Sequence, residues 1–190
     1  MRYRTIVADP PWHYDGYANG LGRGGFFAGR KEQAPVQTKP FPYPTMTVDE
    51  IAALPIAELA GSNCWLFLWT TNRYLHDAFH IAEAWGFKYA QTLVWHKTSN
   101  VSPYGGTFSS NHAEHLLACR RGRPPILSRW PSTVIAAPKP NDRHSRKPDA
   151  FLDLIEGSTE PPRVELFARR QRLGWDTWGN EALGHVEMAS

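Results

Sequence analysis

Apolar segments separated by polar turns predict that strands and helices alternate along this chain. The short apolar runs at 4–8, 64–70 and 87–95 are rich in β-branched and aromatic residues, which indicates strands. Between the second and third runs, residues 74–85 place apolar side chains at helical spacing, and Gly86 ends that pattern. A strand, helix and strand in this order are typical of parallel strands joined by a crossover helix.

The second half of the chain continues the alternation. Further apolar runs predict strands at 115–119, 133–137 and 163–168, and Pro148 followed by Asp149 marks the first turn of another helix. We therefore expect an α/β sandwich with a largely parallel central sheet. Ligands of such folds bind beyond the carboxyl ends of the strands.

Two segments, 13–44 and 98–111, lack any sustained periodicity and are rich in residues that favour turns. We expect both to be long loops of the kind that often contribute to binding sites. Shortly after the first of them, Thr47 and Glu50 have the spacing of a helix capping box. The helix that they begin should break or start again near Pro55.

Length and composition indicate one domain spanning residues 1–190. Hydrophobic residues make up 42% of the chain and charged residues 21%, which excludes a disordered chain or a coiled coil. The longest apolar run, 64–69, is far shorter than a membrane span, so we expect no membrane association and a cytoplasmic location. The two cysteines form no C-x-x-C pair, so neither a disulfide framework nor a metal site is expected.

The small net charge of +3 is unevenly distributed. Residues 120–172 hold twelve Lys or Arg against six Asp or Glu, whereas the rest of the chain is slightly acidic. This excess suits a face that binds a polyanion, but solvated arginine-rich loops would show the same pattern. Charge alone leaves both interpretations open.

The candidate chemistry lies where the first strand ends. Two prolines stop the strand, so the sequence Asp9-Pro10-Pro11-Trp12 places a carboxylate, a rigid carbonyl and a large aromatic ring at its carboxyl end. An exocyclic amine of a nucleobase is a poor nucleophile unless acceptors orient its N–H bonds, and Asp9 with the Pro10 carbonyl could supply two. Trp12 could stack on the base. In the alternative interpretation, Pro10 and Pro11 only end the strand and Trp12 fills the core.

These residues belong to a series of motifs that resembles the N6-adenine methyltransferases of the messenger-RNA m6A-writer type, the methyltransferase-A seventy-kDa-like family. The resemblance covers nearly the whole chain. Its other motifs are Pro42-Tyr43-Pro44-Thr45-Met46, Trp65-Leu66-Phe67-Leu68-Trp69-Thr70, Val94-Trp95-His96-Lys97-Thr98, Asn111-His112-Ala113-Glu114-His115, Ser145-Arg146-Lys147-Pro148-Asp149, Glu165-Leu166-Phe167-Ala168-Arg169 and Gly179-Asn180-Glu181.

The resemblance implies S-adenosylmethionine as methyl donor and a Rossmann-like three-layer fold in which the catalytic strand precedes the donor-binding strand. It implies that Lys147 binds the carboxylate of the donor and that Asp9 binds its ammonium. Phe167 and Arg169 would lie where the fold holds the donor, and Arg169 with Asn180 would contact its ribose.

The resemblance further implies that Tyr43 lines the pocket of the acceptor base and that Glu181 contacts the donor, although a tyrosine between prolines could equally anchor a loop. Glu181 replaces a glutamine of the eukaryotic writer, so it can only accept a hydrogen bond. Ala168 stands where relatives often have glycine. The residues that contact the donor adenine in the writer precede its catalytic strand, so the way this chain holds that ring is left open.

Three rival patterns carry less weight. Residues 20–25 match G-x-G-x-x-G but follow no strand and open no helix, so we interpret them as loop. His76 and His80 lie one helical turn apart without a third metal ligand, which favours a solvated helix face. The stretch 112–115 contains two histidines around a glutamate, and we interpret it as structural or as part of the acceptor side.

The sequence therefore predicts an S-adenosylmethionine-dependent methyltransferase acting on N6 of adenine in nucleic acid. DNA is favoured over RNA because the chain lacks the long extensions of the eukaryotic writer. Alternatives are a non-catalytic nucleic-acid-binding subunit, which should have lost the carboxylate or the aromatic ring at 9–12, and transfer to a protein amide. Homo- and hetero-oligomers are both left open.

Overall fold

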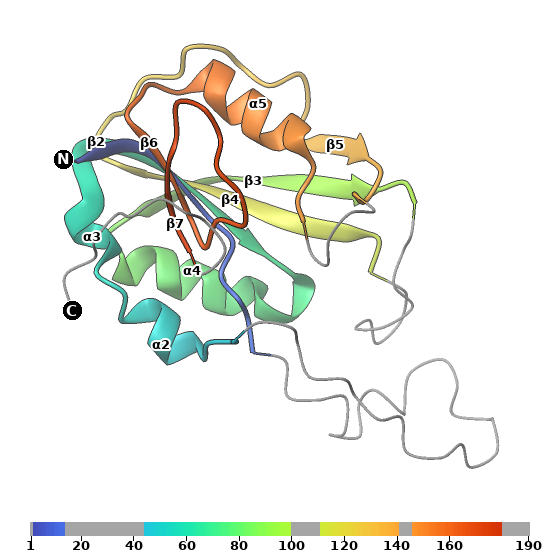
Figure 1. The fold of residues 1–190 in the computed structure, drawn as a ribbon, viewed down its shortest axis with the longest axis horizontal. Coiled ribbons are helices and arrows are strands. Elements are labelled where there is room, and N and C mark those ends of the chain that lie inside the picture. Colours follow the sequence, from blue (N-terminus) through green and yellow to red (C-terminus); the bar gives the residue numbers. More distant parts are fainter. Residues whose placement is uncertain (1, 14–43, 100–110, 141–145, 180–190) are drawn as a thin grey trace.

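The computed structural model describes residues 2–13, 44–99, 111–140 and 146–179 (Figure 1). Seven strands form one sheet in the order β5-β3-β4-β2-β1-β6-β7. Their bounds are Tyr3–Ala8 (β1), Ala60–Thr70 (β2), Lys88–Lys97 (β3), Ala113–Arg121 (β4), Val134–Ala137 (β5), Arg163–Leu166 (β6) and Asp176–Trp178 (β7).

The sheet is mostly parallel, as the sequence predicts. β1 pairs in parallel with β2 and β6, β6 with β7, and β3 with β5. Only β4 runs in the opposite direction, between β2 and β3. The amino end of β4 therefore lies at the same sheet edge as the carboxyl ends of the other six strands, and we call this the carboxyl edge.

Helices cover both faces of the sheet (Figure 1). Helix α5 (Asp149–Ser158) lies on one face, whereas α2 (Val48–Ala52) and α4 (Leu75–Ala84) lie on the other; α3 (Ile56–Leu59) and the 3-10 turn η1 (Asn72–Tyr74) complete the described helices. Because strand side chains alternate between faces, each layer has its own core. Leu68 packs in the cluster with α4, and Trp69 packs edge-on against Phe151 of α5.

This is a Rossmann-like three-layer fold, and most predicted elements are confirmed. Gly86 ends the α4 region at φ +79°, which a residue without a side chain adopts readily, and the capping box at Thr47 and Glu50 is formed. The three-residue strand β7 was not predicted because it carries no apolar run. Most of the two expected loops lies outside the described residues.

No helix in the described part of the chain is long and apolar enough to cross a membrane. The free cysteines Cys64 and Cys119 are both buried in the strands where the sequence places them.

The cap of α2 is expected to contribute measurably to stability. Thr47→Ala removes the hydroxyl that accepts from the Glu50 backbone N–H, and we expect the free energy of unfolding in urea to fall by about 1 kcal/mol. The matched control is Ser128→Ala, in an exposed loop. An equal effect of both changes would contradict this role of the cap.

Candidate active site

The turn after β1 is fixed by backbone hydrogen bonds on both of its sides. The Trp12 N–H donates to the Pro10 carbonyl at 2.9 Å, which closes a tight turn. The neighbouring Met46 N–H donates to the Pro11 carbonyl at 2.8 Å, and the His13 N–H donates to the Met46 carbonyl at 3.1 Å. The segment before α2 thus holds the turn that begins at Asp9, although the two are far apart in sequence.

Trp12 is buried on the face of the sheet that α2 and α4 cover. Its side chain is 6% exposed, and its ring stacks on Tyr74 with centroids 4.9 Å apart and an angle of 13° between the planes. The Tyr74 hydroxyl donates to the His13 carbonyl. One ring face is therefore already occupied, which agrees with the interpretation that Trp12 fills the core, and stacking of Trp12 on a base stays a prediction.

Asp9 faces the opposite layer, where four alternating charges line the carboxyl edge. The Lys147 ammonium lies 2.7 Å from Asp9 Oδ2 and 3.2 Å from Glu114 Oε2, and the Lys97 ammonium lies 2.6 Å from Glu114 Oε1. The side chains of the two lysines and Glu114 are 12% exposed, and that of Asp9 is 20% exposed. We call Lys97, Glu114, Lys147 and Asp9 the charge ladder.

The charge ladder rests on aromatic rings of the core beneath α5. The Lys147 ammonium lies 5.4 Å from the ring centroid of Trp69, and the Lys97 ammonium lies 5.2 Å from that of Trp95. Both rings are nearly fully buried. Such contacts stabilise a cation in a poorly hydrated place.

Burial and the neighbouring charges act against each other on the pKa values of Glu114, Lys147 and Asp9. Burial alone would raise the pKa of Glu114, but Lys147 and Lys97 outweigh burial and hold this pKa below its ordinary value. Burial would lower the pKa of Lys147, and the negative charges of Asp9 and Glu114 instead raise it. Burial raises the pKa of Asp9, and Lys147 opposes that rise.

Glu165 is a further buried carboxyl group that faces the α5 layer. It lies in β6 opposite Val7 of β1, and its Oε2 is buried without a hydrogen-bond partner in the described residues. Burial, and after it the negative charge of Asp9, raises the pKa of Glu165 to about 7. In the described part of the chain, one oxygen of this buried acid is thus left without a hydrogen-bond donor.

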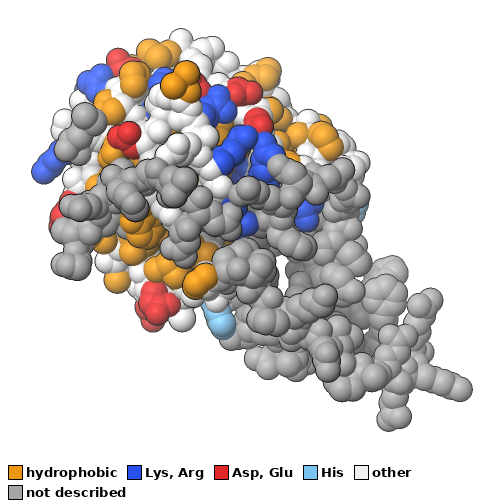
Figure 2. All heavy atoms as spheres, viewed as in Figure 1, with side chains coloured by type: hydrophobic (Ala, Val, Ile, Leu, Met, Phe, Trp, Pro, Cys, Tyr) orange, Lys and Arg blue, Asp and Glu red, His pale blue; other side chains and the backbone are white. Residues whose placement is uncertain are grey.

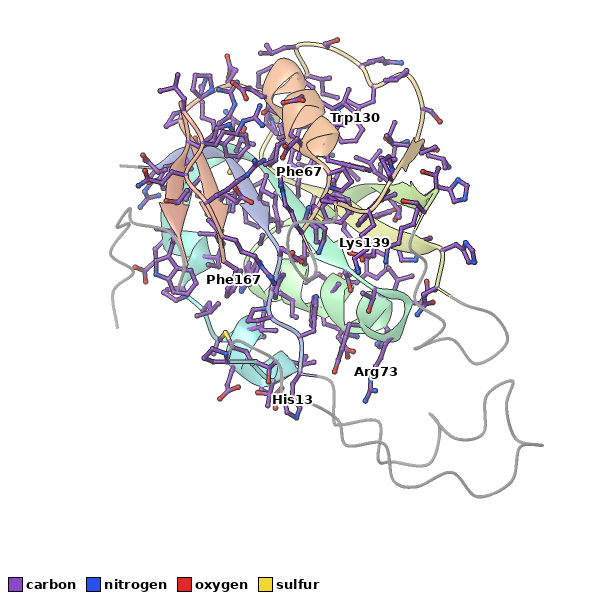
Figure 3. All side chains as sticks on the ribbon, turned by 45° about the vertical axis from the view of Figure 1, so that its right-hand side comes forward. His13, Phe67, Arg73, Trp130, Lys139 and Phe167 are labelled. Carbon is purple, nitrogen blue, oxygen red and sulfur yellow. The ribbon has the colours of Figure 1, made fainter. Side chains whose placement is uncertain are left out.

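The backbone after β6 forms a close turn at the carboxyl edge. Phe167 adopts φ +61°, in the left-handed region, and its ring packs edge-on against Trp178. A Cβ on Gly179 would lie 2.6 Å from the backbone N and O of Ala168, so only glycine fits there. In Figure 3, Phe167 lies on the side of the edge that carries β6 and β7, whereas Arg73 and His13 lie on the side that carries α4 and α2.

The predicted site residues are thus brought together in part. Asp9 and Lys147 meet directly, and the charge of Arg169 acts on Asp9. Phe167 lies one residue beyond β6, the neighbour of β1 in the sheet. Their roles stay predictions. The predicted residues Tyr43, Asn180 and Glu181 lie outside the described residues.

Sequence reasoning missed Lys97 and Glu165 and gave Glu114 no definite role. A signal for them existed, because Lys97 and Glu114 flank the ends of two predicted strands and Glu165 alternates with buried apolar neighbours. The pairing of β3 with β4 was needed to bring the first two together.

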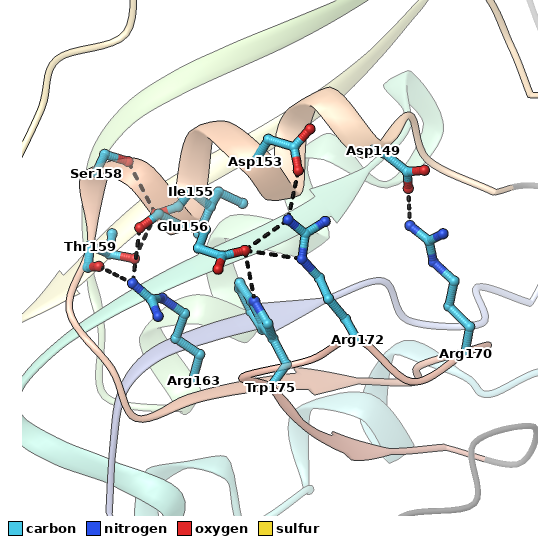
Figure 4. A network of polar contacts seen from close by, with 10 residues as sticks. All are labelled: Asp149, Asp153, Ile155, Glu156, Ser158, Thr159, Arg163, Arg170, Arg172 and Trp175. Atoms are coloured by element: carbon cyan, nitrogen blue, oxygen red, sulfur yellow. Dashed lines mark hydrogen bonds and ion pairs between the residues drawn. The ribbon is translucent and has the colours of Figure 1, made fainter.

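Part of the basic excess of residues 120–172 is used inside the fold (Figure 4). Arg172 binds Asp153 at 2.6 Å and Glu156 at 2.7 Å, and Arg170 binds Asp149 at the start of α5. These pairs fasten the β6–β7 connection to α5. Figure 2 shows acidic side chains among the Lys and Arg side chains, so the visible side of the molecule is not purely positive.

The two histidines of α4 lie on the exposed face of the helix. The rings of His76 and His80 lie edge to face with centroids 4.5 Å apart, on exposed residues. Within the described ranges, no group of three or more His, Cys, Asp or Glu residues is placed to hold a metal ion.

Glu165 should give the protein a measurable pH dependence. Its pKa is raised from 4.5 in the unfolded chain to about 7 in the fold, so the stability that its protonated form contributes is complete below pH 4.5 and is lost as pH rises through 7. Between pH 5 and 8, the unfolding free energy of the wild type should fall by up to roughly 3 kcal/mol relative to Glu165→Gln. Urea titrations measure this difference.

The control for that series is Glu58→Gln, at an exposed glutamate of α3. Its stability should follow that of the wild type at every pH. Parallel curves for wild type and Glu165→Gln would show that Glu165 is not a buried acid.

Comparison with known proteins shows which family the sequence belongs to. The family model described as MT-A70 matches residues 3–181. The chain is 30% identical over 185 residues to the type II methyltransferase M.MunI of a Mycoplasma species, which covers 95% of this chain and 78% of that protein.

Longer relatives match over the same region. An N(6)-adenosine-methyltransferase MT-A70-like protein of Arabidopsis thaliana is 28% identical over 192 residues, covering 96% of this chain but 24% of its own length. The N(6)-adenine-specific methyltransferase METTL4 of Homo sapiens is 27% identical over 199 residues, covering 95% of this chain and 38% of its own length. The chain therefore spans a minor part of these two relatives. Because the family model covers nearly all of it, the chain belongs to the MT-A70 family.

Proposed function

We propose that this chain is an S-adenosylmethionine-dependent methyltransferase that places a methyl group on N6 of adenine in nucleic acid, with DNA as the favoured polymer. The observation that carries the proposal is the pairing of Asp9 with Lys147 beside a rigid turn at the carboxyl edge of the sheet. Membership in the MT-A70 family, whose relatives are named as N6-adenine and N6-adenosine methyltransferases, supports the same reaction.

The charges at this edge fit the amino-acid end of the donor. A methionine group carries one ammonium and one carboxylate, and the pair of Asp9 and Lys147 offers the complementary carboxylate and ammonium. The donor would replace one ion pair with two, so no buried charge loses its partner. The turn after β6, with Phe167 at φ +61°, packs closely on Gly179 and lies at the same edge of the sheet.

When bound, S-adenosylmethionine supplies an electrophilic methyl group on a sulfonium. The chain itself has to orient the acceptor amine. With the donor bound, one carboxylate oxygen of Asp9 would pair with the donor's ammonium in place of Lys147, and the second oxygen can accept an N–H of the amine. The Pro10 carbonyl receives the Trp12 N–H, and its second lone pair can accept the other N–H of the amine.

The proton released after transfer passes to solvent, and positioning supplies the catalysis. Trp12 and Tyr74 hold the turn in shape from the other side of the sheet. Contact of Trp12 with the acceptor base is part of the proposal and requires the ring to become more accessible than its 6% exposure.

DNA is favoured because the chain is 30% identical over 185 residues to the type II methyltransferase M.MunI, against 28% over 192 residues for the Arabidopsis N(6)-adenosine-methyltransferase MT-A70-like protein. We further propose a cytoplasmic location, and assembly with itself or another subunit to complete target recognition. A non-catalytic role is disfavoured because the acidic and aromatic residues of the turn are both retained.

The polymer is tested by incubating the purified chain with methyl-labelled donor and separate pools of DNA, RNA and protein. Digestion and mass spectrometry identify the modified nucleoside. We expect N6-methyldeoxyadenosine in the DNA pool. Label confined to RNA adenosine would replace DNA by RNA in the proposal, and label in protein alone, or in no pool, would refute it.

Asp9→Ala should abolish transfer while the fold persists, because it removes both the acceptor for the amine and the partner of Lys147. We expect the initial rate with the preferred polymer to fall at least about 1,000-fold, which exceeds the loss of a single hydrogen-bond donor at many active sites. Asp49→Asn, at an exposed residue of α2, is the control. Circular dichroism verifies folding, and a normal rate for Asp9→Ala would refute the assignment.

A further inference from the structure

Lys97 holds a mostly buried charge far from the turn of Asp9. It ends β3, which β4 and β2 separate from β1 in the sheet. Its ammonium lies 2.6 Å from Glu114 Oε1 and 5.2 Å from the centroid of Trp95, and the side chain is 12% exposed. A lysine in such a place needs a reason, because a buried charge is costly unless its partner requires it.

Glu114 connects Lys97 to the proposed donor site. Each of its two oxygens binds a different lysine, Oε1 binding Lys97 and Oε2 binding Lys147. Because a carboxylate is planar and rigid, its orientation at one oxygen fixes the position of the other. Lys97 therefore constrains where Glu114 can hold the Lys147 ammonium.

The balance of charges in the ladder also indicates that Lys97 affects the position of Lys147. With Lys97 present, the ladder holds two basic and two acidic side chains, and the charge of Arg169 acts on Asp9 from outside it. Without Lys97, the ladder itself would hold one basic and two acidic side chains, and the added negative charge would disfavour an incoming carboxylate. Glu114 would also draw Lys147 toward itself, because no second cation would compete for that carboxylate.

We propose that Lys97 is a positioning residue for donor binding: through Glu114 it holds the Lys147 ammonium where the α-carboxylate of the donor binds. The inference rests on the proposed function, because it takes the amino-acid group of S-adenosylmethionine as the ligand of Asp9 and Lys147. Lys97 touches neither the donor nor the acceptor in this role. Loss of Lys97 should therefore weaken binding of the amino-acid group of the donor and leave binding of its nucleoside group unchanged.

Two ligands separate that selective effect from a general structural one. S-adenosylhomocysteine carries the amino-acid group, whereas 5′-methylthioadenosine keeps the nucleoside and sulfur but lacks that group. In calorimetric titrations of the full chain, Lys97→Met should weaken binding of S-adenosylhomocysteine about tenfold or more, as the loss of a buried charge partner commonly does. Binding of 5′-methylthioadenosine should change less than about twofold.

Three further variants serve as controls. Lys88→Met removes an exposed lysine from the other end of β3 and should change neither affinity. Lys97→Arg keeps the charge and should restore most of the affinity for S-adenosylhomocysteine. If Lys97→Met does not fold, Lys97→Gln keeps an N–H donor for Glu114 without the charge and should show the same selective loss.

Equal weakening of both ligands, or of neither, would overturn the inference. Lys147→Met distinguishes its failure from that of the proposed function. If Lys147→Met selectively weakens S-adenosylhomocysteine but Lys97→Met does not, only the positioning role is wrong. If Lys147→Met has no selective effect either, the proposed placement of the donor is wrong and the inference falls with it.

Discussion

The need to pair opposite charges at a poorly hydrated sheet edge governs this site. Asp9 lies 2.7 Å from Lys147, and Lys147 in turn contacts Glu114. Each of these groups would lose several kcal/mol of hydration if buried alone, on the order of the penalties known for unpaired charges. They are therefore stable only as a set, and the same set offers an ammonium and a carboxylate to a ligand that carries both.

The one reversed strand of the sheet makes this set possible. In a fully parallel sheet, the amino end of β4 would lie at the opposite edge from the end of β1. Because β4 runs antiparallel to β2 and β3, Glu114 reaches the carboxyl edge from the start of a strand. Strand alternation then directs Glu114, Lys97 and Asp9 to the α5 face, where Lys147 precedes the helix.

Much of this architecture could be predicted from the sequence, because long apolar runs and local turn residues report on local structure. The run at 64–70 and the capping box at Thr47 are such signals, and both elements are present. β7 escaped prediction because three residues carry too little periodicity, and it forms only because β6 offers its edge.

The site itself was predictable to a smaller extent. The motif at residue 9 was identified from its chemistry at the end of a predicted strand and the lysine at 147 through family resemblance, and the fold pairs them. The roles of Lys97 and Glu165 depend on strand pairings between distant segments, for which no local pattern exists. The stacking of Trp12 on Tyr74 likewise depends on how the first turn packs against the η1 region.

The stacking of Trp12 on Tyr74 shows that the two ends of the tetrapeptide 9–12 have different structural environments. The carboxylate of Asp9 points to the α5 layer, where the charges are, and Trp12 is buried in the cluster of the α2 and α4 layer. Pro10 and Pro11 connect these two side chains at the edge of the sheet. The pyrrolidine ring of each proline fixes its own backbone angle φ. An aromatic anchor on one face thus limits the positions of a carboxylate on the other. The two rigid prolines therefore link the position of Trp12 on one face of the sheet to the position of Asp9 on the other.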